Sequence, residues 1–332
     1  MMRKSVLSVG AVLAAVSLSA CASGAPASAG PENTTEPEAV RIVIPAESAL
    51  FWDIYVADAQ GLFESNSITP EITLTPGPAA TLAAMSGGGA DVGTPFAEQG
   101  LAAIEKGAPM SIFVGESNTI LVSVVGQKGI ETAEQLRNQK IAAANVDDTA
   151  TYLMQTWLAD EGVSENEFDK IIIGASNERY QAIVTGAVAA ATLTSPIDRQ
   201  AIREGYPVIE AIAEPGILTA HFGTDDFLNN RPEAAARYAK AIQESVAWLL
   251  DPANEEAAIK ILVDRTKVNE EDAQATYDLY MDNDVFIEGS PIDESLLDKS
   301  FGFLIDTGRM TGSPDPADYI DPEPLVAAAD LE

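Results

Sequence analysis

The sequence is poor in the side chains on which many catalytic and metal sites depend. Among its 332 residues it has one cysteine, Cys21, and one histidine, His221. A single thiol excludes a disulfide within the chain, and a lone histidine cannot supply a clustered Cys/His metal site. The sequence also lacks a Gly-x-Ser-x-Gly motif and a P-loop, and Gly87-Gly-Gly89 precedes a strand pattern instead of opening a helix. We therefore expect no enzyme activity, no cofactor and no metal site.

Positive charge and long apolar runs are scarce as well. Lysine and arginine together number 19, against 51 aspartate and glutamate residues, which gives a formal net charge of −32. A chain this acidic has no basic surface with which to approach a polyanion, so we expect no nucleic-acid partner. The apolar stretch at residues 6–20 is too short for a permanent membrane helix, and no later stretch is longer. The remainder is expected to be a soluble domain.

The N-terminus has the layout of a secretory signal. Arg3 and Lys4 precede the apolar stretch, and Leu18-Ser-Ala20 supplies small residues just before Cys21. A cysteine at this place resembles the lipobox of bacterial lipoproteins, which implies that Cys21 is lipidated and holds the protein on the extracytoplasmic face of the cell membrane. The alternative is an ordinary signal peptide with a chance cysteine. We predict a signal peptide at 1–20 and a flexible tether at 21–39, because residues 22–39 contain no large apolar residue.

The part of the chain after residue 40 alternates strand and helix patterns. Apolar runs of strand length occur at 41–45, 72–75, 91–93, 110–115, 119–125, 140–144, 171–173, 189–193 and 217–222. Helical spacing separates many of them, for example at 51–63 and 149–161. This alternation predicts an α/β fold with parallel sheets, and about 290 residues are more than one typical domain needs. We expect two lobes.

The chain after residue 222 has a helical pattern. Pro232 stands in the first turn of a helix whose apolar side carries Tyr238, Ile242, Val246 and Leu249. A further helix is expected to begin after Asn269, with acids where the macrodipole favours them, and a last helix follows before a proline-rich tail at 314–324. The C-terminal third is therefore predicted to be helical.

Five stretches in order resemble the solute-binding proteins of bacterial ABC importers, in the branch that binds nitrate, sulfonates, taurine and thiamine precursors. These stretches are Tyr55-Val-Ala-Asp-Ala-Gln-Gly-Leu-Phe63, Gly89-Ala-Asp-Val-Gly93, Ala133-Glu-Gln-Leu136 with Lys140-Ile-Ala, Gly186-Ala-Val-Ala-Ala190 and Asp226-Phe-Leu-Asn-Asn-Arg-Pro-Glu233. The sequence departs from the family pattern at Arg137-Asn-Gln139, where Gly-Lys is usual, and at Ala189, where an acid is common. The resemblance covers roughly residues 41–310.

The resemblance implies a two-lobed, type II periplasmic-binding-protein-like fold with two hinge strands. Lobe one would comprise residues 41–122 and 223–332, and lobe two residues 123–222. The crossings between them are expected near residues 123–126 and 221–224. A ligand would lie in the cleft between the lobes and be buried when the hinge closes.

The candidate ligand-binding residues follow from the strand pattern, because ligands of open α/β sheets lie beyond the carboxyl ends of the strands. In the first lobe they are Ser48, Trp52, Pro78, Thr81, Thr94, Glu116, Ser117 and Asn118, and in the second lobe Asp147, Thr149, Thr194 and Ser195, together with His221 near the hinge. The start of a helix at Pro78 offers free N–H groups to an anionic or carbonyl group.

Three of these candidates have competing interpretations. Trp52 is expected to stack on a planar ligand, although the same residue could hold its helix against the core. Asp148 and Thr149 are interpreted at least equally well as helix caps, so Asp147 is the better candidate for ligand contact. His221 is interpreted first as a structural hydrogen-bonding residue.

The leading hypothesis for function is a lipid-anchored, monomeric receptor that captures a small organic molecule and delivers it to the permease and ATPase of an ABC importer. The favoured ligand is a thiamine-precursor-like pyrimidine or a similar planar heterocycle, because the predicted cleft holds acids and, apart from nearby Arg179, no cation. The alternatives are a sulfonate- or nitrate-type anion, a sensory lipoprotein, and an enzyme similar to the pyrimidine synthases on this fold. Those enzymes use a cysteine-rich motif that this chain lacks.

Overall fold

The computed structural model describes residues 36–146 and 148–331. The predicted signal peptide, the lipidation of Cys21 and most of the predicted tether lie outside these residues. The first strand begins at Glu38, earlier than predicted, so residues 38 and 39 belong to a sheet and not to a tether. Within the described ranges no helix is both long and apolar enough to span a bilayer.

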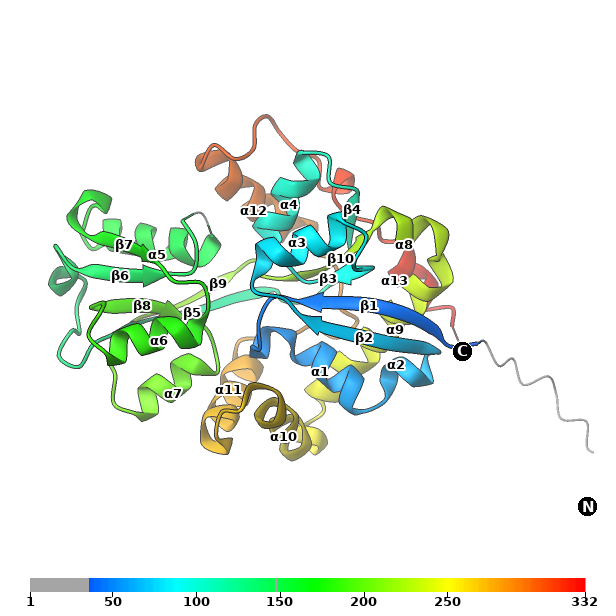
Figure 1. Cartoon of the computed structure of the whole chain (residues 1–332), viewed down its shortest axis with the longest axis horizontal. Helices are drawn as coiled ribbons and strands as arrows, with labels where there is room; N and C mark the ends of the chain where they lie inside the picture. The colour runs from blue at the N-terminus through cyan, green and yellow to red at the C-terminus, as the bar shows by residue number, and fades with distance from the viewer. Residues whose placement is uncertain (1–35, 147, 332) are drawn as a thin grey trace, which may run out of the picture. The chain divides into compact units, whose positions relative to one another are not determined.

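Two five-stranded sheets form the framework (Figure 1). Sheet one contains, in spatial order, β2 (Ile68–Leu74), β1 (Glu38–Ile44), β3 (Val92–Gly93), β10 (Ala220–Thr224) and β4 (Met110–Gly115). Sheet two contains, in spatial order, β7 (Asp169–Ile172), β6 (Lys140–Ala143), β8 (Ala190–Leu193), β5 (Thr119–Gly126) and β9 (Val208–Pro215). The strands predicted from apolar runs are therefore present, with ends shifted by a few residues.

Each sheet is mixed, whereas the alternation of strands and helices predicted parallel sheets. In sheet one β1 is parallel to β2 and β3, but β10 is antiparallel to β3 and β4. In sheet two β6 is parallel to β7 and β8, but β5 is antiparallel to β8 and β9. The two reversed strands, β5 and β10, are the ones that the chain enters directly from the other sheet. A helical crossover, which makes neighbours parallel, does not precede them.

The chain passes between the sheets at residues 116–118 and 216–219, earlier than the predicted crossings at 123–126 and 221–224. Ser123 and Val124 are already paired with both β8 and β9 inside sheet two, and His221 is paired with Val114 inside sheet one. The two crossing segments lie together, because the Gly216 N–H donates to the Asn118 carbonyl at 3.0 Å. The first crossing falls on the polar residues 116–118 between two apolar runs, and the second falls partly inside the apolar run predicted at 217–222.

Helices cover both sheets. Those that follow the strands of sheet one are η1 (Ala49–Phe51), α1 (Trp52–Ala59), α2 (Leu62–Ser65), α3 (Pro78–Ser86) and α4 (Ala97–Glu105). Those that follow the strands of sheet two are η2 (Ala133–Leu136), α5 (Thr149–Asp160), η3 (Glu165–Glu167), α6 (Ser176–Val184) and α7 (Ile197–Arg203). The helical pattern at 51–63 was predicted to stop at Gly61-Leu-Phe63, and α1 does end just before Gly61, whose φ of 68° is left-handed.

The C-terminal third is helical, as predicted. Its elements are α8 (Asp225–Asn230), α9 (Pro232–Leu250), η4 (Pro252–Asn254), α10 (Glu255–Thr266), α11 (Glu270–Asp282), α12 (Glu294–Asp306), η5 (Pro316–Asp318) and α13 (Glu323–Ala328). All four predicted apolar residues of α9 are buried, and α9 packs against α1, α2 and α13. Asn269 caps α11 by accepting the Asp272 N–H at 2.8 Å.

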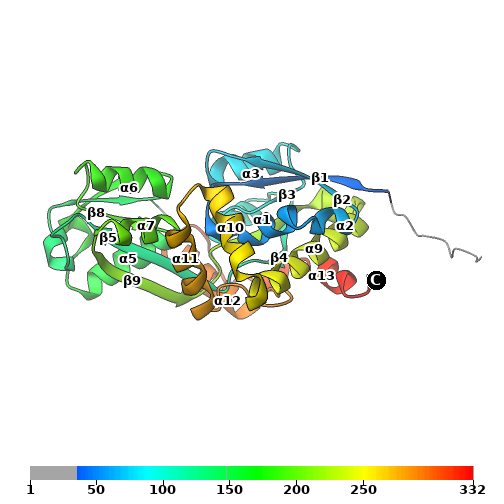
Figure 2. The ribbon, with the colours of Figure 1, turned by 90° about the horizontal axis from the view of Figure 1, so that it is seen from below.

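Helix α11 also contacts sheet two's α7, and Figure 2 shows the two side by side. Arg203 of α7 and Asp272 of α11 form a two-pronged ion pair, with donor–acceptor distances of 2.8 and 3.0 Å. The C-terminal helices therefore return to sheet one and also touch the helices of sheet two.

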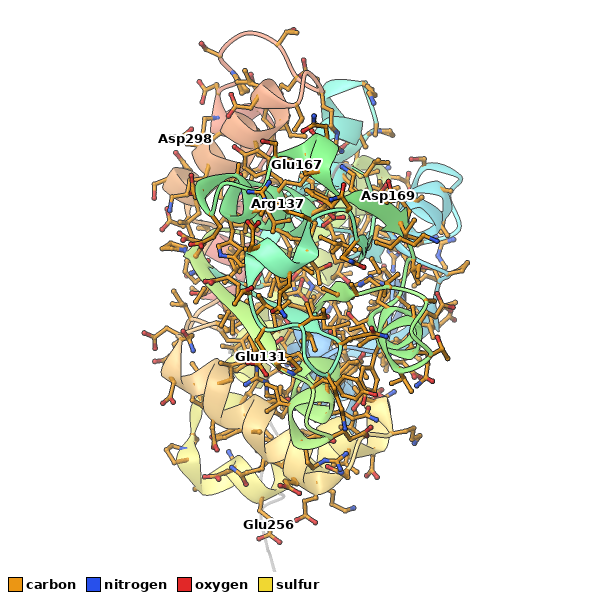
Figure 3. All side chains as sticks on the ribbon, turned by 90° about the vertical axis from the view of Figure 1, so that its left-hand side faces the viewer. Glu131, Arg137, Glu167, Asp169, Glu256 and Asp298 are labelled. Atoms are coloured by element: carbon orange, nitrogen blue, oxygen red, sulfur yellow. The ribbon has the colours of Figure 1, made fainter. Side chains whose placement is uncertain are left out.

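The exterior is acidic, as the composition requires. Figure 3 labels Glu131, Asp169, Glu256 and Asp298, and all four are exposed. Arg137, which departs from the family pattern, has a local structural role. It pairs with Glu134 at 2.7 Å and with Glu167, and its guanidinium also donates to the Gly162 carbonyl at 2.7 Å.

Candidate ligand-binding site

The carboxyl ends of the parallel strands of the two sheets point towards each other. In Figure 1 the arrows of β1 and β2 run towards sheet two, and those of β6 and β8 run towards sheet one. Three hydrogen bonds join the two edges. The Ser48 hydroxyl and the Ala49 N–H donate to the Ser195 carbonyl at 3.3 and 3.4 Å, and the Thr149 hydroxyl donates to the Glu98 carboxyl at 3.2 Å. The predicted residues Ser48, Thr149 and Ser195 therefore meet where the two sheets face each other.

The sheet-one side of this junction contains the start of α3 and the end of β3. Pro78 is the first residue of α3, and no side chain caps that helix. Thr81 is fully buried, with its hydroxyl 2.6 Å from that of Thr75, so it supports the loop instead of facing a ligand. Thr94 is also fully buried, but its hydroxyl has no hydrogen-bond partner. Buried polar atoms almost always have a partner, so the Thr94 hydroxyl is an open position.

The sheet-two side contains the loops after β7 and β8. The hydroxyls of Thr194 and Ser176 lie 3.0 Å apart at the start of α6, which no side chain caps. The Ser195 hydroxyl donates to Asp198 at 2.8 Å. Thr192, on β8, is buried with an unpartnered hydroxyl. Polar groups without partners thus occur on both sides of the junction.

Arg179 lies beneath the sheet-two loops and is 4% exposed. Its guanidinium donates to the carbonyls of Thr192 at 2.6 Å and Ile173 at 3.0 Å, and to the Ser176 hydroxyl at 2.9 Å. No carboxylate of the described residues lies within ion-pair distance of it, and burial lowers the pKa of Arg179 to about 10. At neutral pH the guanidinium is therefore a buried positive charge whose hydrogen bonds, among the described residues, go to neutral acceptors, while the charges of Asp148 and Glu178 act on it from further away. The sequence showed Arg179 near the cleft but not that it lacks an acidic partner.

Glu98, in the first turn of α4, is a site residue that the sequence analysis missed. It is fully buried, and its Oε1 has no partner. Burial, and next the charge of Asp148, raise the pKa of Glu98 to about 8. The carboxyl is therefore mostly protonated at neutral pH and offers a hydrogen-bond donor. Thr94 was selected because it follows the carboxyl end of a strand. The same search would have reached Glu98 if it had been continued by one helical turn.

The loop Glu116–Asn118 forms the first crossing and not a cleft wall. The Ser117 hydroxyl accepts the N–H groups of Leu218 and Thr219, each at 3.3 Å. The Asn118 N–H donates to the Val285 carbonyl at 3.1 Å. Ser117 and Asn118 therefore hold the crossing segments together.

Glu116 and His221 meet at the base of the crossing. His221 is fully buried, with Nε2 at 2.8 Å from Asp53 and Nδ1 at 2.9 Å from the Tyr238 hydroxyl. The interpretation of His221 as a hydrogen-bonding residue agrees with these contacts. Glu116 is 4% exposed, and neither carboxyl oxygen has a hydrogen-bond partner of normal geometry. Burial, and then the nearby charge of Asp53, hold the pKa of Glu116 well above its usual range.

The expected stacking of a ligand on Trp52 is wrong for this structure. Trp52 is completely buried, its indole N–H donates to the Ala258 carbonyl at 3.2 Å, and its ring meets Tyr277 and Tyr280 edge-on at 6.0 and 6.2 Å. The residue begins α1 and faces the packed helices α10 and α11, which the sequence pattern did not place there. Trp52 therefore belongs to the core.

The helix-cap interpretation of Asp148 agrees with the structure. Asp148 accepts the Thr151 N–H at 2.9 Å as the N-cap of α5, and Thr149 is the first residue of that helix. Asp147, the preferred ligand contact of this loop, lies outside the described residues.

Of two surface pockets in the described part of the chain, one reaches a residue of this junction and the other does not. One, of about 160 Å³, is lined by residues of α5, β9 and α12, and Thr149 is the predicted site residue that it reaches. The other, of about 330 Å³, is lined by residues of η4, α10 and α11, among them Glu256 and Glu270, and by no predicted site residue. At the junction the two edges are in direct contact.

The strand order of the two sheets defines the class of fold. In each sheet three parallel strands are followed by one reversed strand and a fifth strand, and two short segments connect the sheets. This is the two-lobed, type II periplasmic-binding-protein-like fold that the resemblance implied. Residues 49–256 match the sequence profile of the NMT1/THI5-like family, and the chain belongs to that family.

Solved structures support the same fold. The alkanesulfonate-binding protein SsuA of Xanthomonas axonopodis pv. citri, bound to MOPS, has a TM-score of 0.71 at 16% identity, over 87% of this chain and 99% of its own. The periplasmic nitrate-binding protein NrtA of Synechocystis PCC 6803 has a TM-score of 0.72 at 16% identity, over 90% of each chain. The desulfurization enzyme DszB has a TM-score of 0.63 at 11% identity, over 88% of this chain and 99% of its own. No curated protein matches the sequence.

Proposed function

We propose that this protein is an extracytoplasmic solute-binding protein that captures a small oxyanion, of the sulfonate or nitrate type, for an ABC importer. The family, the two-lobed fold and the polar junction between the two strand edges support this function. In this proposal the protein binds its ligand by hinge closure and catalyses no reaction. The chain has no thiol besides Cys21, and its one histidine is hydrogen-bonded to Asp53 and Tyr238.

The buried charge of Arg179 is the observation that carries the choice of ligand class. An arginine that forms no ion pair with the described residues, beside the uncapped start of α6, favours negative charge at the junction. The Glu98 carboxyl, whose pKa is raised to about 8, carries little negative charge at neutral pH and so does not repel an anion as a carboxylate would. Among the acids from which the sequence argued against an anion, Glu116 has a pKa held well above its usual range by burial, so that argument overstates the negative charge.

The thiamine-precursor-like heterocycle is the competing ligand. It rested on Trp52 as a stacking surface, and Trp52 is in the core. A thermal-shift screen separates the two classes, because a ligand at a hundred times its Kd stabilises the folded state by about 2.7 kcal/mol. We expect alkanesulfonates, taurine or nitrate to raise the melting temperature. A rise with aminopyrimidines alone would contradict the oxyanion class while leaving the solute-binding function intact.

Replacing Arg179 by glutamine should weaken oxyanion binding by about tenfold to a hundredfold, because a charge-assisted interaction contributes about 1.5–3 kcal/mol. Isothermal titration with the best sulfonate of the screen measures the loss. R199Q is the matched control, since Arg199 is an arginine of the same sheet unit whose charge Asp198 neutralises at 2.8 Å. Equal affinities of R179Q and the wild type would exclude Arg179 from ligand recognition.

Lipid anchoring through Cys21 is part of the proposal. We expect the wild-type protein to sediment with membranes and to partition into detergent, and the C21S variant to appear in the soluble extracytoplasmic fraction. Cell fractionation followed by immunoblotting measures both. Membrane association that C21S leaves unchanged would indicate an ordinary signal peptide and a different anchor.

Measuring ligand uptake by cells distinguishes delivery to an importer from a sensory role. Disruption of the partner permease should abolish accumulation of the labelled ligand while leaving binding to the purified protein intact. Unchanged uptake would favour the sensory lipoprotein.

A further inference from the structure

The cluster of Asp53, Glu116 and His221 lies apart from the strand-edge junction and is not used by the proposed function. Each residue comes from a different element: Asp53 from the first turn of α1, Glu116 from the first crossing and His221 from β10. Each offers one ligand atom, and these atoms lie within 4.8 Å of one another. All three side chains are buried.

The cluster brings two acidic side chains together in the interior. Asp53 lies 2.8 Å from Nε2 of His221, and the Glu116 carboxyl lies close to both. Among the described residues no lysine or arginine nitrogen lies within ion-pair distance of Asp53 or Glu116. Other buried acids of the described residues do have such a partner in several cases, as Asp91 has in Arg41 at 2.6 Å and Asp272 in Arg203 at 2.8 Å. Buried charges in proteins are normally paired or coordinate a metal.

The hydrogen bonds around the cluster suit a coordinated imidazole. A metal-bound histidine normally uses its second ring nitrogen in a hydrogen bond that fixes the ring. In this protein Nδ1 of His221 is 2.9 Å from the Tyr238 hydroxyl, and Nε2 faces the two carboxyls. Asp53 is held as well, because its Oδ1 accepts the Ile54 N–H at 2.7 Å. Glu116 alone has both oxygens free.

From this arrangement we infer that Asp53, Glu116 and His221 form a binding site for a divalent transition-metal ion, with Zn²⁺ as the best-suited ion. One imidazole nitrogen and two carboxylate oxygens form a ligand set that zinc accepts, with one position left for water. Ligand atoms of a tetrahedral zinc site lie about 3.4 Å apart at the usual bond lengths. The observed spacing needs only a small movement of the Glu116 side chain, whose oxygens have no hydrogen bond of normal geometry among the described residues.

The position of the site gives the ion a structural role. Glu116 belongs to the first crossing, and His221 follows the second crossing closely in the chain. A bound ion would tie both segments to α1 at the base of the junction between the sheets. This role does not depend on the identity of the transported solute.

Zinc binding to the purified protein tests the inference. The chain is prepared without a polyhistidine tag and with the C21S substitution, so that His221 is the one histidine and no thiol competes. After chelator treatment and dialysis, zinc content is measured by elemental analysis and affinity by competition with a chromogenic chelator. We expect one zinc ion per chain and a raised melting temperature with zinc.

The variants E116Q and H221Q should bind zinc at least tenfold more weakly. D91N is the matched control, because Asp91 is an equally buried acid that arginine already neutralises, and its zinc affinity should equal that of the parent. Equal zinc affinity in the parent, E116Q and H221Q would overturn the inference.

A second measurement needs no variant at the site. Because the chain has a single histidine, ¹⁵N-histidine labelling gives the two ring-nitrogen resonances of His221 alone. One equivalent of Zn²⁺ should shift the Nε2 resonance far more than that of Nδ1, and Mg²⁺ should not. Resonances that stoichiometric Zn²⁺ leaves unchanged would contradict the site, whatever the variants show.

Discussion

Replacing Trp52 by alanine is expected to lower the free energy of unfolding by about 3–5 kcal/mol, the usual cost of removing a fully buried large aromatic side chain. The indole also loses a hydrogen bond to Ala258 and edge contacts with Tyr277 and Tyr280. Helices α10 and α11 belong to the C-terminal third of the chain. Loss of the Trp52 side chain should therefore weaken the contact of α1 with these helices. Urea unfolding followed by circular dichroism measures the difference.

The controls for this prediction are the other two tryptophans. Trp157 and Trp248 are only half-buried, so W157A and W248A should cost clearly less than W52A. Ligand affinity of the folded fraction of W52A should stay near that of the wild type. A large loss of affinity with little loss of stability would restore Trp52 as a ligand-stacking residue and contradict its assignment to the core.

The sequence predicted the framework because the framework depends on local patterns. Apolar runs located the strands, and the apolar side of α9 was identified residue by residue, because burial of one face imposes a period on the sequence. Short or polar elements were missed. Helix α7 and helix α10 have weaker patterns, and α13 lies in a segment that its prolines made look like a tail.

The site was predicted less completely, since it depends on contacts between distant segments. The strand-end rule brought Ser48 and Ser195 to the junction, although they are far apart in the sequence. It could not show that the loop at 116–118 is a crossing or that Trp52 meets α11. Nor could a sequence show that Arg179 lacks an acidic partner, because partners are decided by packing.

The same limit applies to the ionisation of Glu98. By sequence it is one acid among 51, yet it is fully buried between the two strand edges, next to Thr149 and in the field of Asp148. These surroundings disfavour its charged form. The free energy of unfolding should therefore depend on pH through a residue that lies where the two sheets meet.

The E98Q variant should remove a pH dependence that the wild type shows. The folded-state pKa of Glu98 is raised to about 8 from an ordinary value of 4.5, so the folded state binds the proton more tightly than the unfolded state does. The stabilisation by this proton is fully present below about pH 4.5 and is lost as the pH rises to about 8. At 1.36 kcal/mol per pKa unit the loss is at most about 5 kcal/mol, whereas a neutral glutamine cannot lose it.

Urea unfolding of both proteins between pH 5 and 9 measures this difference. The stability of the wild type relative to E98Q should fall steadily up to about pH 8 and then level off. E131Q, at an exposed glutamate on the rim of sheet two, should follow the wild type. If the curves of the wild type and E98Q ran parallel, Glu98 would be ionised throughout, and its proton could not be offered to an anion. Oxyanion affinity gives the matching functional test, because it should decline in the wild type as Glu98 loses its proton and stay constant in E98Q.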